Sequence, residues 1–492
     1  MLFTTAAFVY VFLPLVLAGF FLIAGRIGPS AAAAWLFIAS LVFYGVWMPA
    51  YVLLLLGSIV ANYGLGRRIA AAGAGSPLAR RWLALGVAAN LGLLAYYKYA
   101  NFFVDNLNLA LGTHWQIGQV LLPIGISFFS FTQIAFLADA YQKGVRELRF
   151  SHYGLFVTYF PHLIAGPVLH HAQMMPQFRD PQTYRANGAN LAAGLAIFAL
   201  GLVKKVVLAD GIAPYADAVF APADAGQIPS AAEAWLGALA YTLQLYFDFS
   251  GYSDMAIGLS LMFNVRLPFN FNSPYRAANI SDFWRRWHIS LSNFLRDYLY
   301  IALGGNRRGP LRRYLNLATT MLLGGLWHGA SWSFVLWGGL HGLYLMINHG
   351  FRALCGEALH RRLARSRPFL LASWLLTMLA VVVAWVFFRA QTLAGALRLL
   401  EAMAAPAAAE VHRLLWQAGL HLDTGLAWCA ALGALACLAP NSNVIGARLQ
   451  ALCAHRPATR ALLAGAALCA VTLLVLLNTA RSGTSAFIYF NF

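Results

Sequence analysis

Residues 281–309 read SDFWRRWHISLSNFLRDYLYIALGGNRRG, and residues 314–342 read YLNLATTMLLGGLWHGASWSFVLWGGLHG. The first segment is polar and aromatic. The second is apolar over a length that crosses a membrane, for which a helix needs about 20 residues. His288 lies in the first segment, and His328 lies at the centre of the second. A histidine within an apolar run of this length is costly in a bilayer and is a functional candidate by default.

The composition of the whole chain indicates an all-α, polytopic membrane protein. Of its 492 residues 61% are hydrophobic and 10% are charged, whereas soluble proteins carry about 25% charged residues. Apolar segments recur from Leu2 to Leu477, so we expect one continuous integral-membrane domain over residues 1–492 with about ten to twelve membrane-associated helices. A membrane barrel would show short segments of alternating polarity instead.

The net charge of +18 comes from short basic clusters between the apolar runs. This distribution is typical of cytoplasmic loops of membrane proteins and does not favour nucleic-acid binding. Some clusters are candidates for contact with anionic lipid heads or with a phosphate-bearing donor. The five cysteines form no C-x-x-C pair, and the neighbours His170 and His171 point to different helix faces, so we predict no metal site.

His288 and His328 are both predicted to lie on helices. Ser281 or Asn279 can cap an amphipathic helix that ends at Gly304, with His288 on its polar flank. His328 falls about 21 Å along a second helix, over Tyr314–Ile347.

Trp327 and Trp332 flank His328, and we expect them to keep its imidazole desolvated and neutral, the form that accepts a proton from a hydroxyl. The alternative for either histidine is a packing or polar-face role without chemistry.

Two further segments carry polar residues or prolines inside an apolar frame. Pro161 and Pro167 predict a broken or re-entrant segment within residues 153–178. Asp248 and Asp254 are six residues apart and do not share a helix face, so a glycosidase-like acid pair is not indicated. We interpret these aspartates as partners for buried donors.

Several motifs together carry a resemblance to a known family. They are LPIGISFFSF, AGPVLHHAQMMPQF, GLVKKVVLAD, LYFDFSGYSDMAIG, NFNSPYRAANISDFWRRWHISLSNFLRDYLYIALGGNR and GLWHGASW. The chain resembles the membrane-bound O-acyltransferase (MBOAT) superfamily, and within it the bacterial branch that contains the alginate O-acetyltransferase membrane subunit. The resemblance runs from about Met1 to Phe492, and the DFWRRWHIS and GLWHGA blocks are highly specific together.

The resemblance implies acyl transfer on a ring of helices with a tunnel from the cytosolic side to a central histidine. In this family the essential histidine matches His328. A second signature residue of the family, often Asn or His, matches His288. The resemblance implies acetyl-CoA or another activated acyl group as donor substrate, with no bound cofactor. It also implies a bacterial inner membrane, and a soluble periplasmic or extracellular acetyltransferase that hands the acyl group to a polysaccharide.

The residues around the histidines agree with direct transfer. Because the chain shows no Gly-x-Ser-x-Gly elbow, an acyl-serine is not favoured. Three residues are candidates to orient the acceptor or to stabilise the developing oxyanion, namely His288, Trp284 and Asn293. Arg307 and Arg308 are candidates to bind the donor's phosphates. The alternative for these arginines is a solvated cytoplasmic loop.

The C-terminal tail, residues 481–492, reads RSGTSAFIYFNF. FIYFNF resembles the C-terminal motif of the small partner peptide of teichoic-acid D-alanylation, in which a tyrosine relays the acyl group. This resemblance makes Tyr489 a possible acyl relay; the alternative is an interfacial aromatic anchor.

Two other functions stay open on the sequence. One is transfer of D-alanyl or another acyl group within the same superfamily. The other is a transporter, which broken helices with intramembrane polar residues also fit, although we find no inverted repeat.

Overall fold

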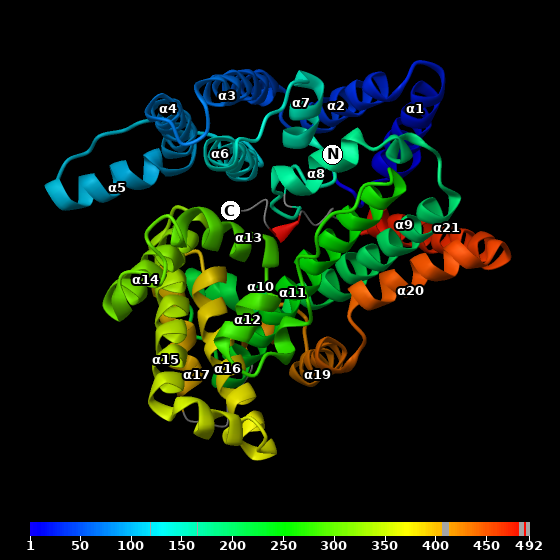
Figure 1. The fold of residues 1–492 in the computed structure, drawn as a ribbon. Coiled ribbons are helices and arrows are strands. Elements are labelled where there is room, and N and C mark those ends of the chain that lie inside the picture. Colours follow the sequence, from blue (N-terminus) through cyan, green and yellow to red (C-terminus); the bar gives the residue numbers. More distant parts are fainter. Residues whose placement is uncertain (119, 165, 406–412, 482–486, 489–492) are drawn as a thin grey trace. The chain divides into compact units, whose positions relative to one another are not determined.

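The computed structural model describes residues 1–492 except 119, 165, 406–412, 482–486 and 489–492, and every regular element in the described part is helical (Figure 1). The prediction of an all-α fold is confirmed. The chain divides into two compact units that alternate along the sequence. Unit 1 contains Met1–Leu202, Tyr252–Phe269 and the described part of 442–488, and unit 2 contains Val203–Gly251 and Asn270–Asn441.

The helices of unit 1 are mostly long and apolar. They are η1 (Ala7–Phe12), α1 (Leu13–Arg26), α2 (Pro29–Gly45), η2 (Pro49–Tyr51), α3 (Val52–Ala72), α4 (Pro77–Leu94), η3 (Ala95–Tyr99), α5 (Ala100–Leu111), α6 (Ile126–Lys143), α7 (Phe150–Thr158), α8 (His171–Arg179), η4 (Pro181–Tyr184), α9 (Gly188–Leu202), α20 (Ser442–His455) and α21 (Pro457–Ala480).

The helices of unit 2 include several short ones. They are η5 (Val203–Ala209), α10 (Asp210–Asp224), η6 (Pro274–Arg276), α12 (Ile280–Arg286), α13 (Ile289–Phe294), η7 (Leu295–Tyr300), α14 (Gly309–His328), α15 (Trp332–Leu363), α16 (Arg367–Arg389), α17 (Leu393–Ala404), α18 (Arg413–Gln417) and α19 (Leu422–Leu438). The long helix α11 (Ala231–Met262) belongs to unit 2 up to Gly251 and to unit 1 beyond it.

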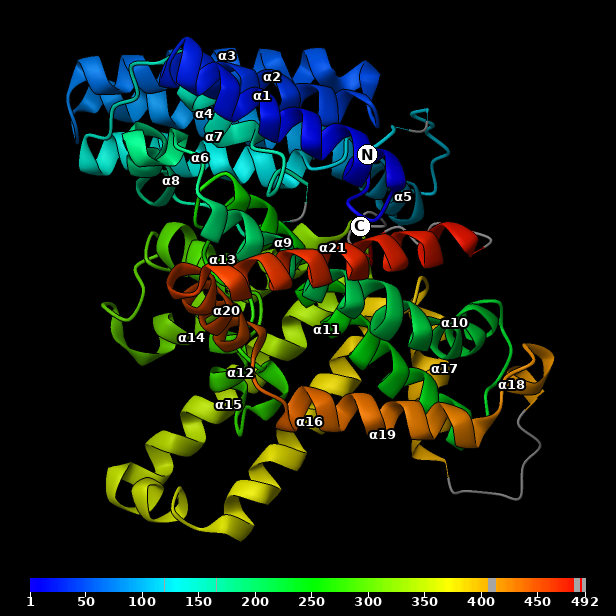
Figure 2. The same ribbon diagram turned by 90° about the vertical axis from the view of Figure 1, so that its right-hand side faces the viewer.

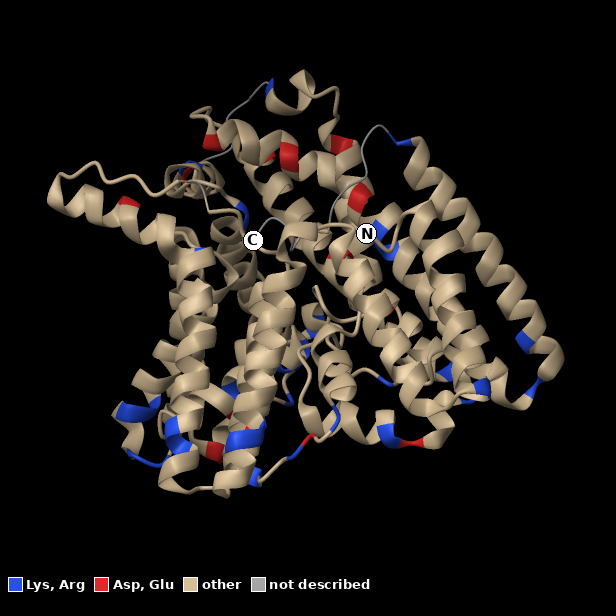
Figure 3. Cartoon of the chain, turned by 90° about the horizontal axis from the view of Figure 1, so that it is seen from above, with Lys and Arg blue, Asp and Glu red and all other residues tan. Residues whose placement is uncertain are grey.

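Six helical stretches of the described chain are long and apolar enough to cross a membrane, or seven if α19 and α20 count together. This test counts fewer helices than the ten to twelve predicted as membrane-associated. α2 is too short for it, and helices with internal polar residues, such as α11, α14 and α15, are not apolar enough. Lys and Arg lie mostly toward helix ends, as expected when helix centres face lipid (Figure 3).

In unit 1 the first and last α-helices each pack along a neighbouring helix. α1 packs along α2, and α9 runs beside both α20 and α21 (Figure 2). Gly194 of α9 and Gly258 of α11 meet so closely that a Cβ on Gly258 would lie 2.5 Å from the carbonyl oxygen of Gly194. Only glycine permits this backbone contact, which brings α9 against the end of α11.

The proline-rich segment of unit 1 is broken, as predicted. α7 ends at Thr158, before Pro161, and a buried irregular stretch leads to α8 at His171. Pro161 stops the helix because proline cannot donate a backbone hydrogen bond and clashes with the preceding turn.

A buried carboxylate, Glu147, ties α8 to the loop after α6. Arg179 Nη2 donates to Glu147 Oε2 at 2.8 Å, and the backbone N–H of Arg149 donates to Oε1 at 3.1 Å. Burial alone would raise the pKa of the Glu147 carboxyl. Hydrogen bonds from His171, Arg149 and Arg179, together with the charge of Arg179, outweigh burial and lower that pKa to about 2.

In unit 2 a buried lysine holds two aspartates. Lys205 Nζ lies 2.8 Å from Asp210 Oδ1 and 2.7 Å from Asp248 Oδ1, and all three side chains are almost fully buried. Asp248 is therefore the partner of a buried donor, as the sequence indicated. Such a cluster is tolerated only because each charge has a close opposite charge.

Candidate active site

His328 ends α14 and lies at the turn of a helical hairpin. The predicted single helix over Tyr314–Ile347 is wrong, because the chain turns at Gly329 and a new helix, α15, begins at Trp332. Ser331 caps α15 by accepting a hydrogen bond from the N–H of Phe334. The sequence prediction ran one helix through Gly329, Ala330 and Ser331, whereas these residues form the turn.

Glycines bring α14 and α15 together along this hairpin (Figure 1). A Cβ on Gly325 would lie 2.3 Å from the carbonyl oxygen of Phe334, and a Cβ on Gly338 would lie 2.3 Å from that of Met321. Ordinary contacts begin near 3.4 Å. The two backbones therefore touch directly, and this contact fixes where His328 lies against α15.

Aromatic rings enclose the imidazole of His328, which is 4% exposed. Its ring centroid lies 5.0 Å from that of Trp327, 5.0 Å from that of Trp337 and 5.1 Å from that of Phe388. The rings of Trp337 and Phe388 both meet it edge to face. α14, α15 and α16 each contribute to this desolvated site.

The desolvated setting predicted for His328 is thus observed, but one of its two predicted walls differs. Trp327 is buried as expected. Trp332 is 55% exposed because it opens α15 at the edge of the turn. Trp337, which follows one and a half turns later on α15, packs on the histidine instead.

His288 also lies at a break rather than within a helix. The predicted amphipathic helix starts at its Asn279 cap, whose side chain accepts from the N–H of Asp282 at 2.9 Å, but it stops at Arg286. His288 has φ 44°, in the left-handed region, and α13 starts after it. Contrary to the expected polar flank, its side chain is fully buried.

Asn270 explains the break, because it supplies hydrogen bonds that a continuous helix would not make. Its backbone oxygen accepts from the N–H of Ile289 at 3.0 Å, and its Oδ1 accepts from Ser290 Oγ at 2.9 Å. The same Oδ1 lies 3.2 Å from His288 Nδ1. An amide oxygen only accepts, so Nδ1 carries the proton and Nε2 is the basic nitrogen of His288.

The structure brings the two predicted histidines together. The ring centroids of His288 and His328 are 6.4 Å apart, and the Trp327 ring lies 6.4 Å from His288 as well. On its other side His288 meets the ring of Phe249 edge to face at 4.8 Å. Two imidazoles in one aromatic enclosure can serve a single reacting group placed between them.

Trp284 and His341 form a hydrogen-bonded pair beside this enclosure. Trp284 Nε1 donates to His341 Nδ1 at 3.3 Å, and both rings pack against Trp337. The indole N–H of Trp284 is engaged in this bond, and its ring packs against Trp337.

The predicted arginines lie at the other end of α14. Arg307 and Arg308 are exposed on the turn before that helix. α14 has 20 residues, so the arginines are about 30 Å from His328 along its axis. Asn293 is partly buried on α13. Tyr489 lies outside the described residues.

Sequence reasoning missed four residues of this site: Phe249, Asn270, Trp337 and Phe388. Three are aromatic residues on long helices, where the sequence does not separate the wall of a site from a side chain that packs or faces lipid. Asn270 lies in a short loop with the sequence PFNFN, and there the sequence held a clue. A polar side chain in such a loop can form hydrogen bonds with backbone groups where a nearby helix is interrupted.

Comparisons with known proteins agree with this architecture. The family described as MBOAT, membrane-bound O-acyltransferase family, matches residues 139–388, which include both histidines. The chain is 45% identical over 431 residues to the peptidoglycan O-acetyltransferase of Helicobacter pylori, covering 82% of this chain and 80% of that protein. It is 47% identical over 408 residues to the probable alginate O-acetylase AlgI of Pseudomonas aeruginosa, with 82% and 75% covered.

A more distant relative is the teichoic acid D-alanyltransferase of Streptococcus thermophilus, 26% identical over 236 residues, covering 46% of this chain and 56% of that protein. The chain therefore belongs to the membrane-bound O-acyltransferase family, and it is a multi-pass membrane acyltransferase.

Proposed function

We propose that the chain takes an acetyl group from acetyl-CoA at the cytosolic face of a bacterial inner membrane and passes it outward for O-acetylation of an extracytoplasmic polysaccharide. The observation that carries this proposal is the pair of buried imidazoles, His288 and His328, 6.4 Å apart in one aromatic enclosure. The names of its two closely similar relatives, at 45% and 47% identity, favour acetyl over D-alanyl transfer. Acetyl-CoA is then a substrate, and no bound cofactor is required.

In the proposed reaction His328 acts as the base. It takes the proton of an acceptor hydroxyl while that oxygen attacks the thioester carbonyl carbon. The C–S bond breaks, and the proton passes from His328 to the leaving thiolate, so the products are an acetyl ester and CoA. His288, whose Nδ1–H is bound by Asn270, accepts a hydrogen bond from the acceptor through Nε2 and so helps to position it.

Arg307 and Arg308 are proposed to bind the phosphates of the donor. Their exposed position before α14 suits a charged group from the cytosol. Because α14 separates them from His328 by about 30 Å, which is longer than the arm between the diphosphate and the thioester of acetyl-CoA, the arginines would bind the donor before it moves on to His328.

The acetyl group is proposed to leave on the outer side through a soluble periplasmic or extracellular acetyltransferase. The tail residue Tyr489 is proposed as a covalent relay toward that partner. Tyr489→Phe should leave the fold intact and abolish outward transfer, and full activity in that variant would end the relay proposal.

His328→Ala tests the function as a whole. Purified protein in detergent is given labelled acetyl-CoA and an acceptor, and release of CoA is measured. We expect CoA release from wild type and from a matched His349→Ala variant, which removes a half-buried histidine of α15. We expect none from His328→Ala. An active His328→Ala variant would overturn the mechanism, and no CoA release from any of the three would favour a transporter. Turnover with a D-alanyl donor only would favour the D-alanyl alternative.

A further inference from the structure

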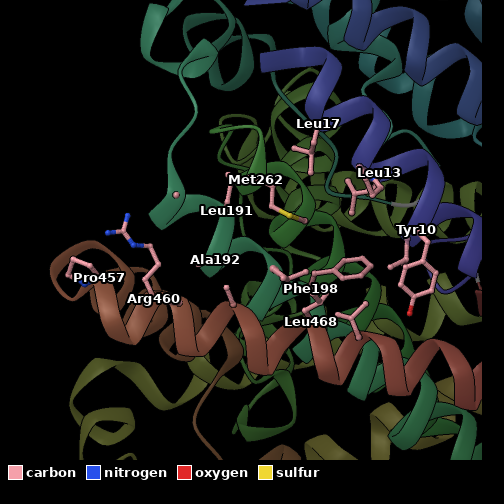
Figure 4. A pocket seen from close by; sticks show the side chains of 17 residues that line it. Tyr10, Leu13, Leu17, Leu191, Ala192, Phe198, Met262, Pro457, Arg460 and Leu468 are labelled. Carbon is pink, nitrogen blue, oxygen red and sulfur yellow. The ribbon is translucent and has the colours of Figure 1, made fainter. Parts of the chain in front are cut away.

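Unit 1 contains an apolar groove far from both histidines in sequence. Its walls come mainly from three membrane-length helical stretches (Figure 4). These are η1 with α1, the stretch that begins with α9, and α21. The volume of the groove is about 680 Å³. Leu13, Leu191, Phe198 and Leu468 are typical of its lining (Figure 4). Ligand sites of this volume are common, and in a membrane span an open apolar groove faces acyl chains.

Arg460 stands at one end of the groove and Tyr10 at the other (Figure 4). Arg460 is the only charged residue among the described residues that line the groove, and it forms no ion pair with any described residue. Its guanidinium lies beside Gly188, where a Cβ would come within 3.3 Å of Nη1. The first residue of α9 thus leaves space for the charged group.

The length of the groove fits one leaflet of a bilayer. From Arg460 to Val471, its last lining residue on α21, the helix rises about 16 Å, close to half of the ~30 Å hydrocarbon core. An acyl chain of one leaflet would therefore fill the groove when its head group is at Arg460.

The charged end of the groove indicates which leaflet this is. α1 runs from the Tyr10 end toward Arg26, and α21 starts just after Arg456, so further positive charges cluster at the Arg460 end. Lys and Arg concentrate on the cytoplasmic side of membrane proteins. Anionic phospholipids of the cytoplasmic leaflet match this charge.

We propose that this groove binds one acyl chain of an anionic phospholipid from the cytoplasmic leaflet, with the lipid phosphate on Arg460. Arginine binds a phosphate through two parallel N–H···O bonds, which gives the site a preference for a phosphodiester over an uncharged head. The apolar walls supply the affinity for the chain. The bound lipid would link α1, α9 and α21 at the edge of unit 1, independently of acyl transfer.

The test is lipid binding to the purified full-length chain by native mass spectrometry. Delipidated protein in detergent is titrated with phosphatidylglycerol, which is anionic, and with phosphatidylcholine, which is zwitterionic. Two variants remove parts of the site: Arg460→Ala removes the charge, and Ala461→Phe fills the groove from α21. Two matched controls on or beside the same helix, Arg456→Ala and Ala466→Phe, make the same changes at exposed residues that do not line the groove.

We expect wild type and both controls to bind phosphatidylglycerol more tightly than phosphatidylcholine. Arg460→Ala should weaken phosphatidylglycerol binding about tenfold or more and abolish the preference, as expected for loss of a charge-assisted hydrogen bond. Ala461→Phe should weaken the binding of both lipids. Equal effects of Arg460→Ala and Arg456→Ala, or wild-type binding by Ala461→Phe, would overturn the proposal. If wild type is dimeric and Ala461→Phe becomes monomeric while it still binds lipid, the groove would be assigned to a second copy of the chain instead.

Discussion

Replacing Gly338 with alanine would place a methyl group against the backbone of α14. The new Cβ would lie 2.3 Å from the carbonyl oxygen of Met321 and 3.1 Å from the Cα of Gly325. Neither neighbour is the flexible end of a side chain, so the two helices must move apart by about 1 Å at this level. Overpacking of this kind costs about 1–3 kcal/mol of stability.

The same movement should reach the reaction site, because Trp337 is the next residue and packs on His328 at 5.0 Å. A displacement of about 1 Å at a reacting centre costs roughly 100-fold in rate. We therefore expect Gly338→Ala to lower both the melting temperature in detergent and the rate of CoA release from acetyl-CoA.

The neighbouring glycine provides a matched control. A Cβ on Gly339 would meet only Leu322 Cδ2, at 3.5 Å, which is an ordinary contact. Both replacements carry the same gain in helix propensity of about 1 kcal/mol, so the comparison isolates the backbone contact. Gly339→Ala should keep wild-type turnover and should be as stable as wild type or more stable by up to about 1 kcal/mol. If the two variants behave alike, the reasoning from the α14–α15 contact is refuted.

Three further changes test other parts of the molecule. Asn270→Ala should lower turnover about tenfold or more while the protein still folds, because buried donors around His288 lose their acceptor; wild-type turnover would contradict this. Above about pH 4.5, Glu147→Gln should have a lower melting temperature than wild type, because the depressed pKa of the carboxyl stabilises the fold there. The difference in melting temperature should shrink as the pH falls toward 2. A difference that does not depend on pH would contradict this prediction. Lys205→Met should destabilise the protein by about 3–5 kcal/mol, because two buried aspartates lose the positive charge beside them. Replacing one of these aspartates by leucine as well should restore part of the loss in a thermal unfolding assay.

Local sequence signals predicted the features of the fold that depend on local chemistry. Asn279 was a predicted cap and is one, because its carboxamide bonds the N–H of the residue three positions on. Pro161 was a predicted break and is one. The position of His328 in a desolvated aromatic site also followed from a short stretch around it.

The features that depend on distant residues were not predictable in the same way. The break at His288 needs Asn270, eighteen residues earlier, to bond Ile289 and Ser290. The end of α14 at His328 depends on a turn whose small residues are also the ones that helix contacts use. Spacing alone therefore cannot tell a packed helix from a hairpin.

The left-handed backbone of His288 limits which amino acids can replace it. At φ 44° a β-branched side chain is strained, whereas asparagine, aspartate and histidine tolerate this region better than other residues with a Cβ. Asparagine also keeps a polar group that can bond at short range. The backbone at residue 288 therefore favours Asn, Asp or His before any chemistry does. A library of variants at this residue should be read first for which side chains the turn accepts.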